Sequence, residues 1–200
     1  MTHMPSVLTI GHSNHEFERF CGLLAATGVT AVADVRSSPA SRFAPQFNKQ
    51  RLSSALDARG LAYDYLGQEL GGRPSEPSLF TGGVADYEKM AATPTFHAGL
   101  ERLLEIAERH RVAVMCAEAD PLNCHRCLLI ARALAERDVG VAHILASGDL
   151  VSHAQIELRL LELAGLTADD LFTSREARLA EAYRARARKV AFAEREAKPA

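Results

Sequence analysis

The sequence predicts an α/β protein: a single-domain, three-layer sandwich with a mainly parallel sheet of about five strands and a charged C-terminal helical extension. The first observation behind this prediction is an alternation of short apolar runs, rich in β-branched residues, with segments whose apolar residues recur at helical spacing. The second is size, because 200 residues with 48% hydrophobic and 24% charged side chains suit one globular domain. Strands that alternate with helices usually pair in parallel, with helices on both faces of the sheet.

The first half of the chain is expected to hold three strands and two helices. Apolar runs predict the strands at residues 7–10, 30–35 and 61–66. Ser13 and Glu16 have the spacing of a capping box, which predicts a helix that begins there and stops at Gly28. Asn48 is suited to cap a second helix, and Gly60 is suited to close it.

The second half continues the alternation after a long loop. Residues 67–83 contain five glycines and two prolines, which predicts a loop with a function or with mobility rather than a linker between domains. The pattern then predicts helices and strands in turn, namely a helix at 95–110, a strand at 112–116, a helix at 124–136, a strand at 141–145 and a helix at 152–164.

Charge is distributed unevenly along the chain. The formal net charge is −2, but residues 174–200 carry eight Lys or Arg and four Asp or Glu, a net of +4 that leaves −6 on residues 1–173. We therefore expect an α/β domain over 1–173, with its motifs inside 7–150, and a charged helical tail over 174–200. The apolar positions of the tail are mostly alanine, which favours an exposed helix over a core element.

Composition excludes several classes of protein. A net charge near zero argues against a strongly basic nucleic-acid binder, and no window approaches the ~20 apolar residues that span a bilayer. The N-terminus lacks the pattern of a secretory signal, so a cytoplasmic protein is expected. Four unevenly spaced cysteines in a chain of this length do not indicate a disulfide scaffold, and they are interpreted as packing, catalytic or metal-binding residues.

Polar side chains gather where the predicted strands end. The carboxyl ends of parallel strands meet at one edge of a sheet, and ligands bind in the crevice there. Loops at the opposite edge, such as 59–60, are plain. The sequence therefore predicts one polar pocket assembled from four distant segments, whose members are His12 and Ser13, then Asp34, Arg36 and Ser37, then Gly71 and Gly72, and then Cys116, Glu118, Cys124, His125 and Arg126.

Four motifs at these strand ends resemble the bacterial domain of unknown function 488 family. They are the runs 9–13 (TIGHS), 34–39 (DVRSSP) with Ser41 and Arg42, 65–67 (YLG) with 70–72 (LGG), and 115–118 (MCAE) with 124–126 (CHR). The resemblance covers roughly residues 7–150 and implies an α/β fold with a shared polar site. It supplies no reaction, and some members of the family carry a DNA-repair label.

The two cysteines of the predicted pocket are the candidate nucleophiles. Cys124 precedes His125 at the start of a predicted helix, where free amides and the helix dipole favour a thiolate, and Cys116 ends a strand. His12 and His125 are candidate proton carriers, and Asp34 is a candidate base or an anchor for an arginine. The alternatives are cysteines that only fill the core and histidines that only complete hydrogen bonds.

The substrate side of the predicted pocket is basic. A guanidinium presents a planar fork that matches phosphate or carboxylate, and glycine allows close backbone approach. The alternative for the arginines is a structural ion pair with Asp34, Glu69 or Glu118. The predicted substrate-binding residues are Ser13, Arg36, Ser37, Arg42, Gly71, Gly72, Glu118 and Arg126.

No cofactor is predicted. The glycine-rich stretches match neither a Walker loop nor a dinucleotide fingerprint, so no ATP or NAD site of those types is expected. Cys124 and Cys127 have the spacing of a redox pair, but Cys127 is expected to face the core. A zinc site from Cys116, Cys124, Cys127 and a histidine is left open but not predicted, because the paired spacing of a zinc ribbon is missing.

Three functions are compatible with these residues. The favoured one is an enzyme that acts on a small anionic, nucleotide-like substrate by Cys/His-dependent transfer or hydrolysis. The first alternative is a nucleic-acid-associated protein, which requires a basic stripe joining residues 36–51 to 175–189. The second alternative is a metal-binding or redox module built on the cysteines.

Overall fold

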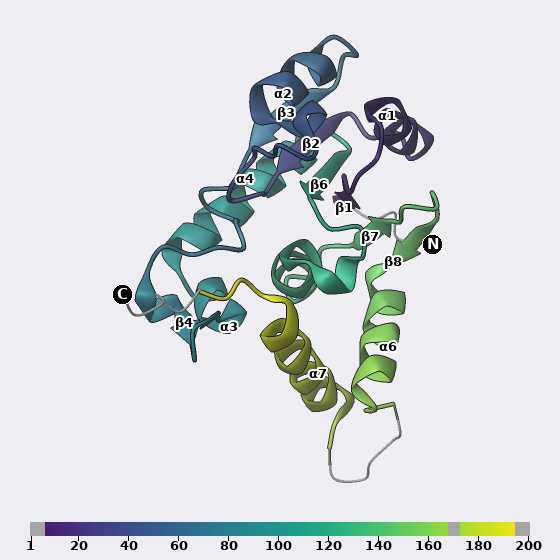
Figure 1. Cartoon of the computed structure of the whole chain (residues 1–200). Coiled ribbons are helices and arrows are strands. Elements are labelled where there is room, and N and C mark those ends of the chain that lie inside the picture. The colour runs from purple at the N-terminus through teal and green to yellow at the C-terminus, as the bar shows by residue number, and fades with distance from the viewer. Residues whose placement is uncertain (1–6, 168–172, 195–200) are drawn as a thin grey trace.

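A computed structural model describes residues 7–167 and 173–194 of the chain (Figure 1). The first six residues, on which part of the prediction of no signal sequence rests, and the last six residues of the predicted tail lie outside the described residues. No helix within the described parts is long and apolar enough to cross a membrane.

The central sheet confirms the predicted fold class and adds a strand to it. Six strands have the order β3-β2-β6-β1-β7-β8, and the first five of these are parallel. The sixth, β8, pairs antiparallel with β7 and was not predicted. The bounds of the strands are β1 Val7–Gly11, β2 Ala31–Asp34, β3 Ala62–Tyr65, β6 Val112–Cys116, β7 Val141–Ile144 and β8 Leu150–Ser152.

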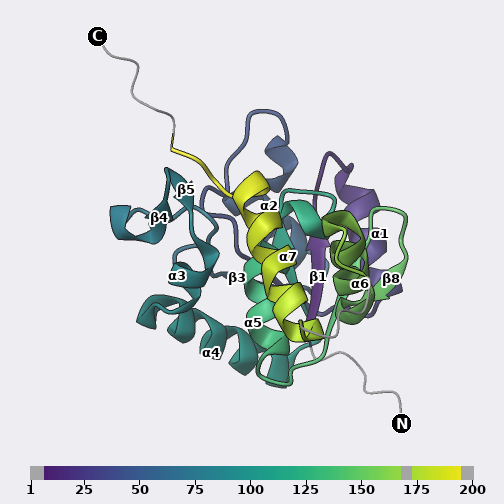
Figure 2. The same ribbon diagram turned by 90° about the horizontal axis from the view of Figure 1, so that it is seen from below.

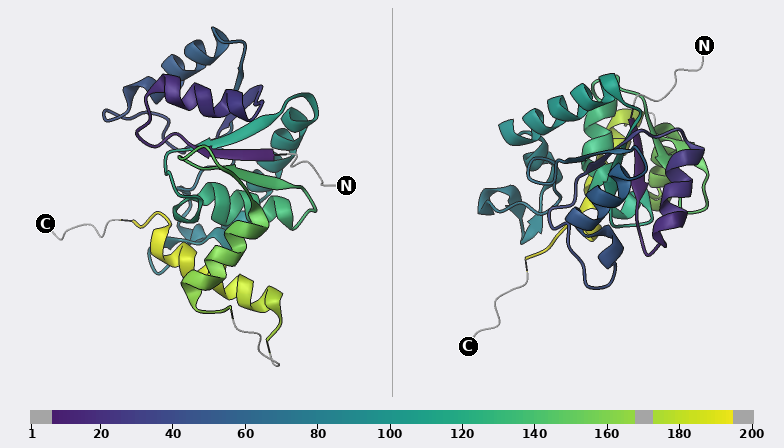
Figure 3. Two further views of the ribbon diagram at one scale, coloured as in Figure 1. Left: turned by 90° about the vertical axis from the view of Figure 1, so that its right-hand side faces the viewer. Right: turned by 90° about the horizontal axis from the view of Figure 1, so that it is seen from above.

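Helices cover both faces of this sheet, as the three-layer prediction requires (Figure 3). On one face, α1 (Phe17–Ala26) and α2 (Lys49–Asp57) pack on Leu8, Ile10 and Met115. On the other, α4 (Pro94–Arg109), α5 (Arg132–Ala135) and α6 (His153–Ala164) pack on alternate strand residues such as Val114 and Cys116. Successive strand residues point to opposite faces, so the side chain of Cys116 lies on the α4–α6 side.

The C-terminal helix α7 (Arg175–Val190) corrects the expectation of an exposed helix. It lies beside α6 (Figures 1 and 2), and its Ala182 and Tyr183 are buried in the main core. Of the alanines of this helix, Ala182 is the one that is fully buried, whereas Ala177 and Ala185 are exposed. After the helix, the backbone of Ala193 pairs with Val84, so the chain returns toward the predicted long loop.

The predicted long loop contains one short strand, and a second follows directly after it. β4 (Phe80–Thr81) and β5 (Val84–Ala85) form a hairpin whose turn residues Gly82 and Gly83 both have positive φ. A short 3-10 turn, η2 (Pro77–Leu79), precedes the hairpin, and helix α3 (Tyr87–Ala91), which was not predicted, follows it. The glycines marked a turn within a small folded unit rather than an open loop.

Two of the predicted caps differ in the structure. Helix α1 begins at Phe17 without a side-chain cap, because Ser13 has φ +48° and its hydroxyl donates to Asn14 instead. Asn48 follows the 3-10 turn η1 (Pro45–Phe47) and does precede α2. Its side-chain oxygen, however, accepts a hydrogen bond from the backbone amide of Ser41 rather than from an amide of the helix. A capping box does form at Ser152, at the start of α6.

Candidate functional site

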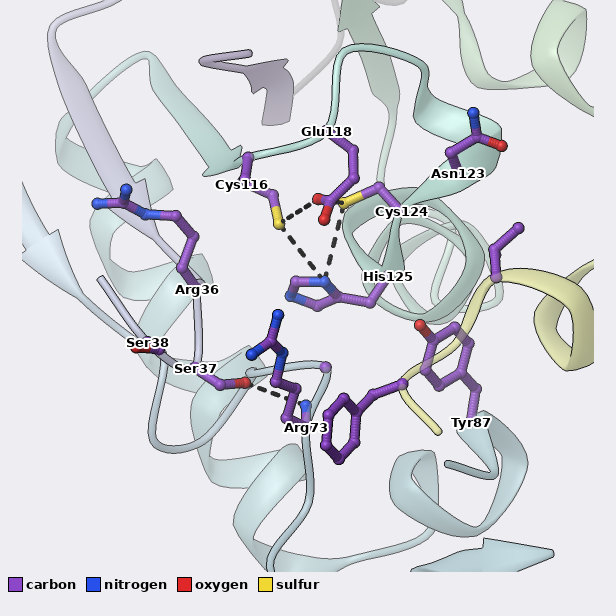
Figure 4. A pocket seen from close by; sticks show the side chains of 14 residues that line it. Arg36, Ser37, Ser38, Arg73, Tyr87, Cys116, Glu118, Asn123, Cys124 and His125 are labelled. Carbon is purple, nitrogen blue, oxygen red and sulfur yellow. Dashed lines mark hydrogen bonds between the residues drawn. The ribbon is translucent and has the colours of Figure 1, made fainter. Parts of the chain in front are cut away.

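A cavity of about 160 Å³ opens at the carboxyl ends of β2 and β6 (Figure 4). It lies at the edge of the sheet where the sequence predicted a polar pocket. The residues that line it come from distant parts of the chain, namely Arg36, Ser37, Ser38, Gly72, Arg73, Tyr87, Cys116, Ala117, Glu118, Asn123, Cys124, His125, Val190 and Phe192.

A turn of the chain brings Cys116 and Cys124 to the same wall of the cavity. Cys116 is the last residue of β6. The carboxylate of Asp120 then accepts from the amide of Leu122 and starts the 3-10 turn η3 (Pro121–Asn123), which reverses the chain. Cys124 follows in an extended conformation, with φ −142° and ψ 141°, and both cysteines are almost fully buried within the lining of the cavity.

The segment after Cys124 differs from the regular helix predicted for residues 124–136. Its first turns form a π-helix, η4 (Arg126–Ala131), which continues into α5. Because Cys124 lies before the helical residues, its sulfur faces the free amides, and the amide of Arg126 donates to it at 3.4 Å. Cys127 is fully buried in the core, as expected.

His125 is oriented toward both sulfurs. Its Nε2 lies 3.0 Å from the carbonyl oxygen of Val35, which only accepts, so Nε2 carries a proton. Its Nδ1 lies 3.5 Å from the sulfur of Cys116 and 3.8 Å from that of Cys124. Gly72 packs against the ring, since a Cβ at that position would meet the imidazole at 2.7 Å.

Glu118 completes the cluster. Its Oε2 lies 2.9 Å from the sulfur of Cys116 and 3.1 Å from the sulfur of Cys124. The backbone of Glu118 crosses the end of β1 so closely that a Cβ on Gly11 would lie 1.8 Å from its carbonyl oxygen. Two thiols, an imidazole and a carboxylate therefore converge at one point (Figure 4).

Electrostatics divide the two thiols into different roles. Burial by itself would raise the pKa of Cys124, but the hydrogen bond from Cys116 and the charges of Arg126 and His125 lower that pKa well below its usual value. Burial and the nearby Cys124 raise the pKa of Cys116, and the same two causes raise that of Glu118. The pKa of His125 is raised against burial by Cys124 and Glu118. These directions favour a thiolate at Cys124 and a protonated ring at His125.

Arg126 supports this assignment through its burial. Its side chain has no exposed surface, and its two Nη atoms donate to the carbonyl oxygens of Glu118 at 2.6 Å and Ala119 at 2.9 Å. Within the described residues it pairs with no carboxylate, and its Nε is buried without a hydrogen-bond partner. A buried cation is costly unless an anion lies nearby, and the Cys124 thiolate supplies one. Arg126 does not line the cavity.

The predicted cluster of His12, Asp34 and Arg36 is a closed structural network. The carboxylate of Asp34 accepts from Arg36 Nη2 at 2.6 Å and from the hydroxyl of Tyr63 at 2.8 Å. Arg36 also donates to Nε2 of His12 and to the carbonyl of Phe47, and Figure 4 shows its guanidinium turned away from the thiols. Its ion pair is the structural alternative that the sequence left open.

His12 lies apart from the cysteines. Its ring stacks on Phe47 at 4.4 Å, and its Nδ1 donates to the carbonyl of Ser13. Burial and the charge of Arg36 lower the pKa of His12 to about 4, so the ring is neutral. With both nitrogens occupied, His12 is not placed to carry a proton for the thiols, and neither Ser13 nor Asp34 lines the cavity.

The predicted substrate-binding residues are only partly brought together. Ser37, Gly72 and Glu118 line the cavity with the cysteines and His125, whereas Gly71 packs behind it against Ser37. Arg42 is exposed and stacks on Phe43, away from the cavity lining. Gly71 and Gly72 do not have the positive φ that their sequence allowed; their lack of a side chain serves close packing instead.

Several lining residues were not assigned from the sequence. Arg73 faces the cavity, stacks on Phe192 at 5.2 Å and forms no ion pair with the described residues. Tyr87 is buried, and burial followed by the charge of Cys124 raises the pKa of its hydroxyl, which keeps it protonated. Arg73 directly follows the glycine pair, which was its only signal. Nothing in the sequence indicated that Val190 and Phe192 return to this pocket.

Two groups of buried donors have the spacing that a metal ion requires. Within each group the donor atoms lie within 4.8 Å of one another among the residues that the structure describes. The first group is Cys116, Cys124 and His125; the second is Cys127, His143 and His153. In the second, the histidines are engaged in a hydrogen-bonded chain that runs from Thr9 through both rings to Tyr183 and Glu157. The first group alone faces the cavity.

Comparison with known proteins gives one match. A family described as a domain of unknown function, DUF488, matches residues 16–133, which include the thiols, Glu118 and His125. No curated protein and no solved structure matches the chain.

Proposed function

The chain belongs to the DUF488 family, and we propose that its pocket is the active site of a cysteine-dependent enzyme that acts on a small anionic substrate, with Cys124 as the nucleophile. The observation that carries this proposal is the contact of the Cys124 sulfur with Nδ1 of His125, whose other nitrogen is fixed by Val35. A thiolate held by an imidazolium is the activated form of a cysteine nucleophile.

The cluster supplies the groups that transfer or hydrolysis requires. The Cys124 thiolate attacks the electrophilic centre of the substrate, and His125 gives its Nδ1 proton to the leaving group. Arg126 stabilises the thiolate from behind the wall, while Tyr87 remains a neutral donor within the cavity lining. Glu118, between the sulfurs, exchanges a proton with the second thiol.

Arg73 is the group that favours an anionic substrate. It is the cavity-lining guanidinium that is not consumed by an ion pair, because Arg36 is held by Asp34. Ser37 accepts from the backbone amide of Arg73 at 3.0 Å, which fixes the start of that side chain at the rim. A nucleotide-like substrate would present its anionic part to this guanidinium.

Nucleic-acid binding and a role in DNA repair have less support. That function needs free basic side chains on the C-terminal helix, but Arg175 pairs with Glu157 and Arg184 with Glu88. Arg186 donates to the carbonyl of Leu122 and to the side chain of Asn123. These arginines join the helix to the body of the protein and are not free to follow phosphates.

Alkylation of the native protein tests the proposal. Reduced full-length protein is treated with iodoacetamide or iodoacetate across pH, and modified cysteines are mapped by mass spectrometry. We expect Cys124 to react before the other cysteines. We also expect the ratio of its rate with iodoacetate to its rate with iodoacetamide to exceed that of an ordinary thiol, because Arg73 attracts the anionic reagent. Arg73→Gln should lower that ratio by about 1.5- to 5-fold, the size of an exposed charge interaction. Arg109→Gln, the same change at the opposite end of β6, should leave it unchanged.

Two results would overturn the proposal. One is a Cys124 that reacts only when the protein unfolds. The other is protein that is isolated with a stoichiometric metal ion and whose thiols become reactive only after chelation, which would favour the metal-binding alternative. Cys127→Ala serves as the control for a buried cysteine outside the cavity and should leave the reaction of Cys124 intact.

A further inference from the structure

The pocket holds a second thiol that simple nucleophilic catalysis does not require. Resting on the proposed function, we infer that Cys116 resolves a mixed disulfide formed on Cys124, so that the enzyme reduces small anionic disulfides. The redox pair would then be Cys116 and Cys124 rather than Cys124 and Cys127, whose spacing in the sequence suggested one.

The geometry selects Cys116 as the partner of Cys124. The two sulfurs share Oε2 of Glu118, at 2.9 and 3.1 Å, and Nδ1 of His125, at 3.5 and 3.8 Å. They lie within 4.8 Å of each other and approach to ~2.05 Å on forming a disulfide. Cys127, by contrast, is fully buried and does not line the cavity.

The two thiols also differ in the way that an attacking and a resolving cysteine differ. The sulfur of Cys124 accepts a hydrogen bond from the backbone amide of Arg126 and faces protonated His125, and both contacts favour its thiolate form. Cys116 ends a buried strand and donates to Glu118, so it stays a thiol until that carboxylate takes its proton. An exchange reaction needs one thiolate at the start and a second thiol that is deprotonated later.

The reaction balances with these four side chains. The Cys124 thiolate attacks one sulfur of the substrate disulfide, the substrate S–S bond breaks, and the released thiolate takes the proton of His125. Cys116 then passes its proton to Glu118 and attacks the Cys124 sulfur. The second substrate thiolate leaves and takes that proton from Glu118. The substrate gains two electrons, the two cysteines are oxidised to a disulfide, and an external dithiol reduces them again.

The test uses two small disulfides of similar size and opposite charge, 3,3′-dithiodipropionate and cystamine. Reduced full-length protein is mixed with each, quenched with a thiol-blocking reagent and mapped by mass spectrometry. We expect wild type to form the Cys116–Cys124 disulfide and to release two thiols per chain. Cys116→Ser should instead retain a stable mixed disulfide on Cys124. Cys127→Ala should behave as wild type, and thermal melting checks that each variant is folded.

The charge of the substrate is tested in the same experiment. The dianionic disulfide should react faster than cystamine, and Arg73→Gln should reduce that preference by about 1.5- to 5-fold. A faster reaction of cystamine with wild type would overturn the assignment of an anionic substrate.

The outcomes separate this inference from the proposed function. If wild type stops at a mixed disulfide on Cys124, Cys116 does not resolve it, and the inference fails while the nucleophile stands. If Cys127→Ala, but not Cys116→Ser, blocks resolution, the redox pair is the one spaced by two residues and the inference fails. If Cys124 does not react with either disulfide or with alkylating reagents, the proposed function fails as well.

Discussion

Substituting Gly72 by alanine tests whether close packing holds the imidazole of His125 in place. A Cβ at position 72 would lie 2.7 Å from Cγ, 2.8 Å from Nδ1 and 3.0 Å from Cβ of His125. Carbon atoms in contact normally lie ~3.5–4.0 Å apart, so the ring or the loop must move by roughly 1 Å. The ring has little room to move, because Val35 holds its Nε2 and the two sulfurs face its Nδ1.

Two measurable effects follow from that displacement. Overpacking of this kind costs about 1–3 kcal/mol, which for a chain of this length lowers Tm by roughly 2–12 °C. A shift of the imidazole by ~1 Å should slow the alkylation of Cys124 by up to roughly 100-fold, since reacting groups depend steeply on position. Thermal melting and alkylation kinetics at fixed pH measure the two effects on one sample.

The matched control is Gly22→Ala. Gly22 lies in the exposed part of α1, where an added Cβ meets no atom within 4 Å, so alanine should stabilise the helix by ~0.5–1 kcal/mol without changing Cys124. A Gly72→Ala protein that melts and reacts like wild type would refute the reasoning, because the ring would then not depend on the space at Gly72.

Three further predictions concern protonation and the buried hydrogen-bonded chain that runs from Thr9 through His143 and His153 to Tyr183 and Glu157. Because the pKa of Cys124 is lowered, its alkylation rate should fall with decreasing pH only at pH values below the pKa of an ordinary thiol, ~8.5. A pH midpoint of the alkylation rate at or above ~8.5 would contradict the thiolate. His12 and His153 have pKa values lowered to about 4, against ~6.5 when unfolded, so each should contribute stability that is complete above pH 6.5 and lost toward pH 4, on the order of 3 kcal/mol over that range. Urea unfolding at several pH values measures this loss, and an unchanged slope in His153→Gln would count against it. Tyr183→Phe removes the hydroxyl that contacts His153 and Glu157 and should cost ~1–2 kcal/mol while the alkylation rate of Cys124 stays the same; a slower rate would show that the two clusters are coupled.

The core of the site was predictable because its assembly is local. Cys116, Glu118, Cys124 and His125 fall within ten residues, on a strand end and the turn that follows, so their proximity needs little knowledge of the fold. The parallel sheet was predictable for a similar reason, since each strand carries its own apolar pattern. Strand β8 was not, because it has only three residues and none of them is buried.

The remaining residues of the site are positioned by tertiary contacts that the local sequence pattern does not reveal. Arg36 is of a residue type that often binds anionic substrates. Only the structure shows that its guanidinium already forms an ion pair with the buried Asp34, two positions before it. Phe192 reaches the cavity because α7 packs against α6 and returns the chain to Val84. An alanine-rich, charged helix gives no signal of that return, since alanine suits an exposed surface and a close helix contact equally well.

The family match leaves out β1, a central strand of the sheet. The family match begins at residue 16, yet β1 (Val7–Gly11) lies between β6 and β7 and pairs with both. A fragment limited to 16–133 would leave the whole hydrogen-bonding edge of β6 open, next to the strand end that carries Cys116. Exposed edges of this kind recruit other chains, so such a fragment should aggregate rather than present a working thiol pair. A shortened version of this protein that is meant to fold therefore has to include β1.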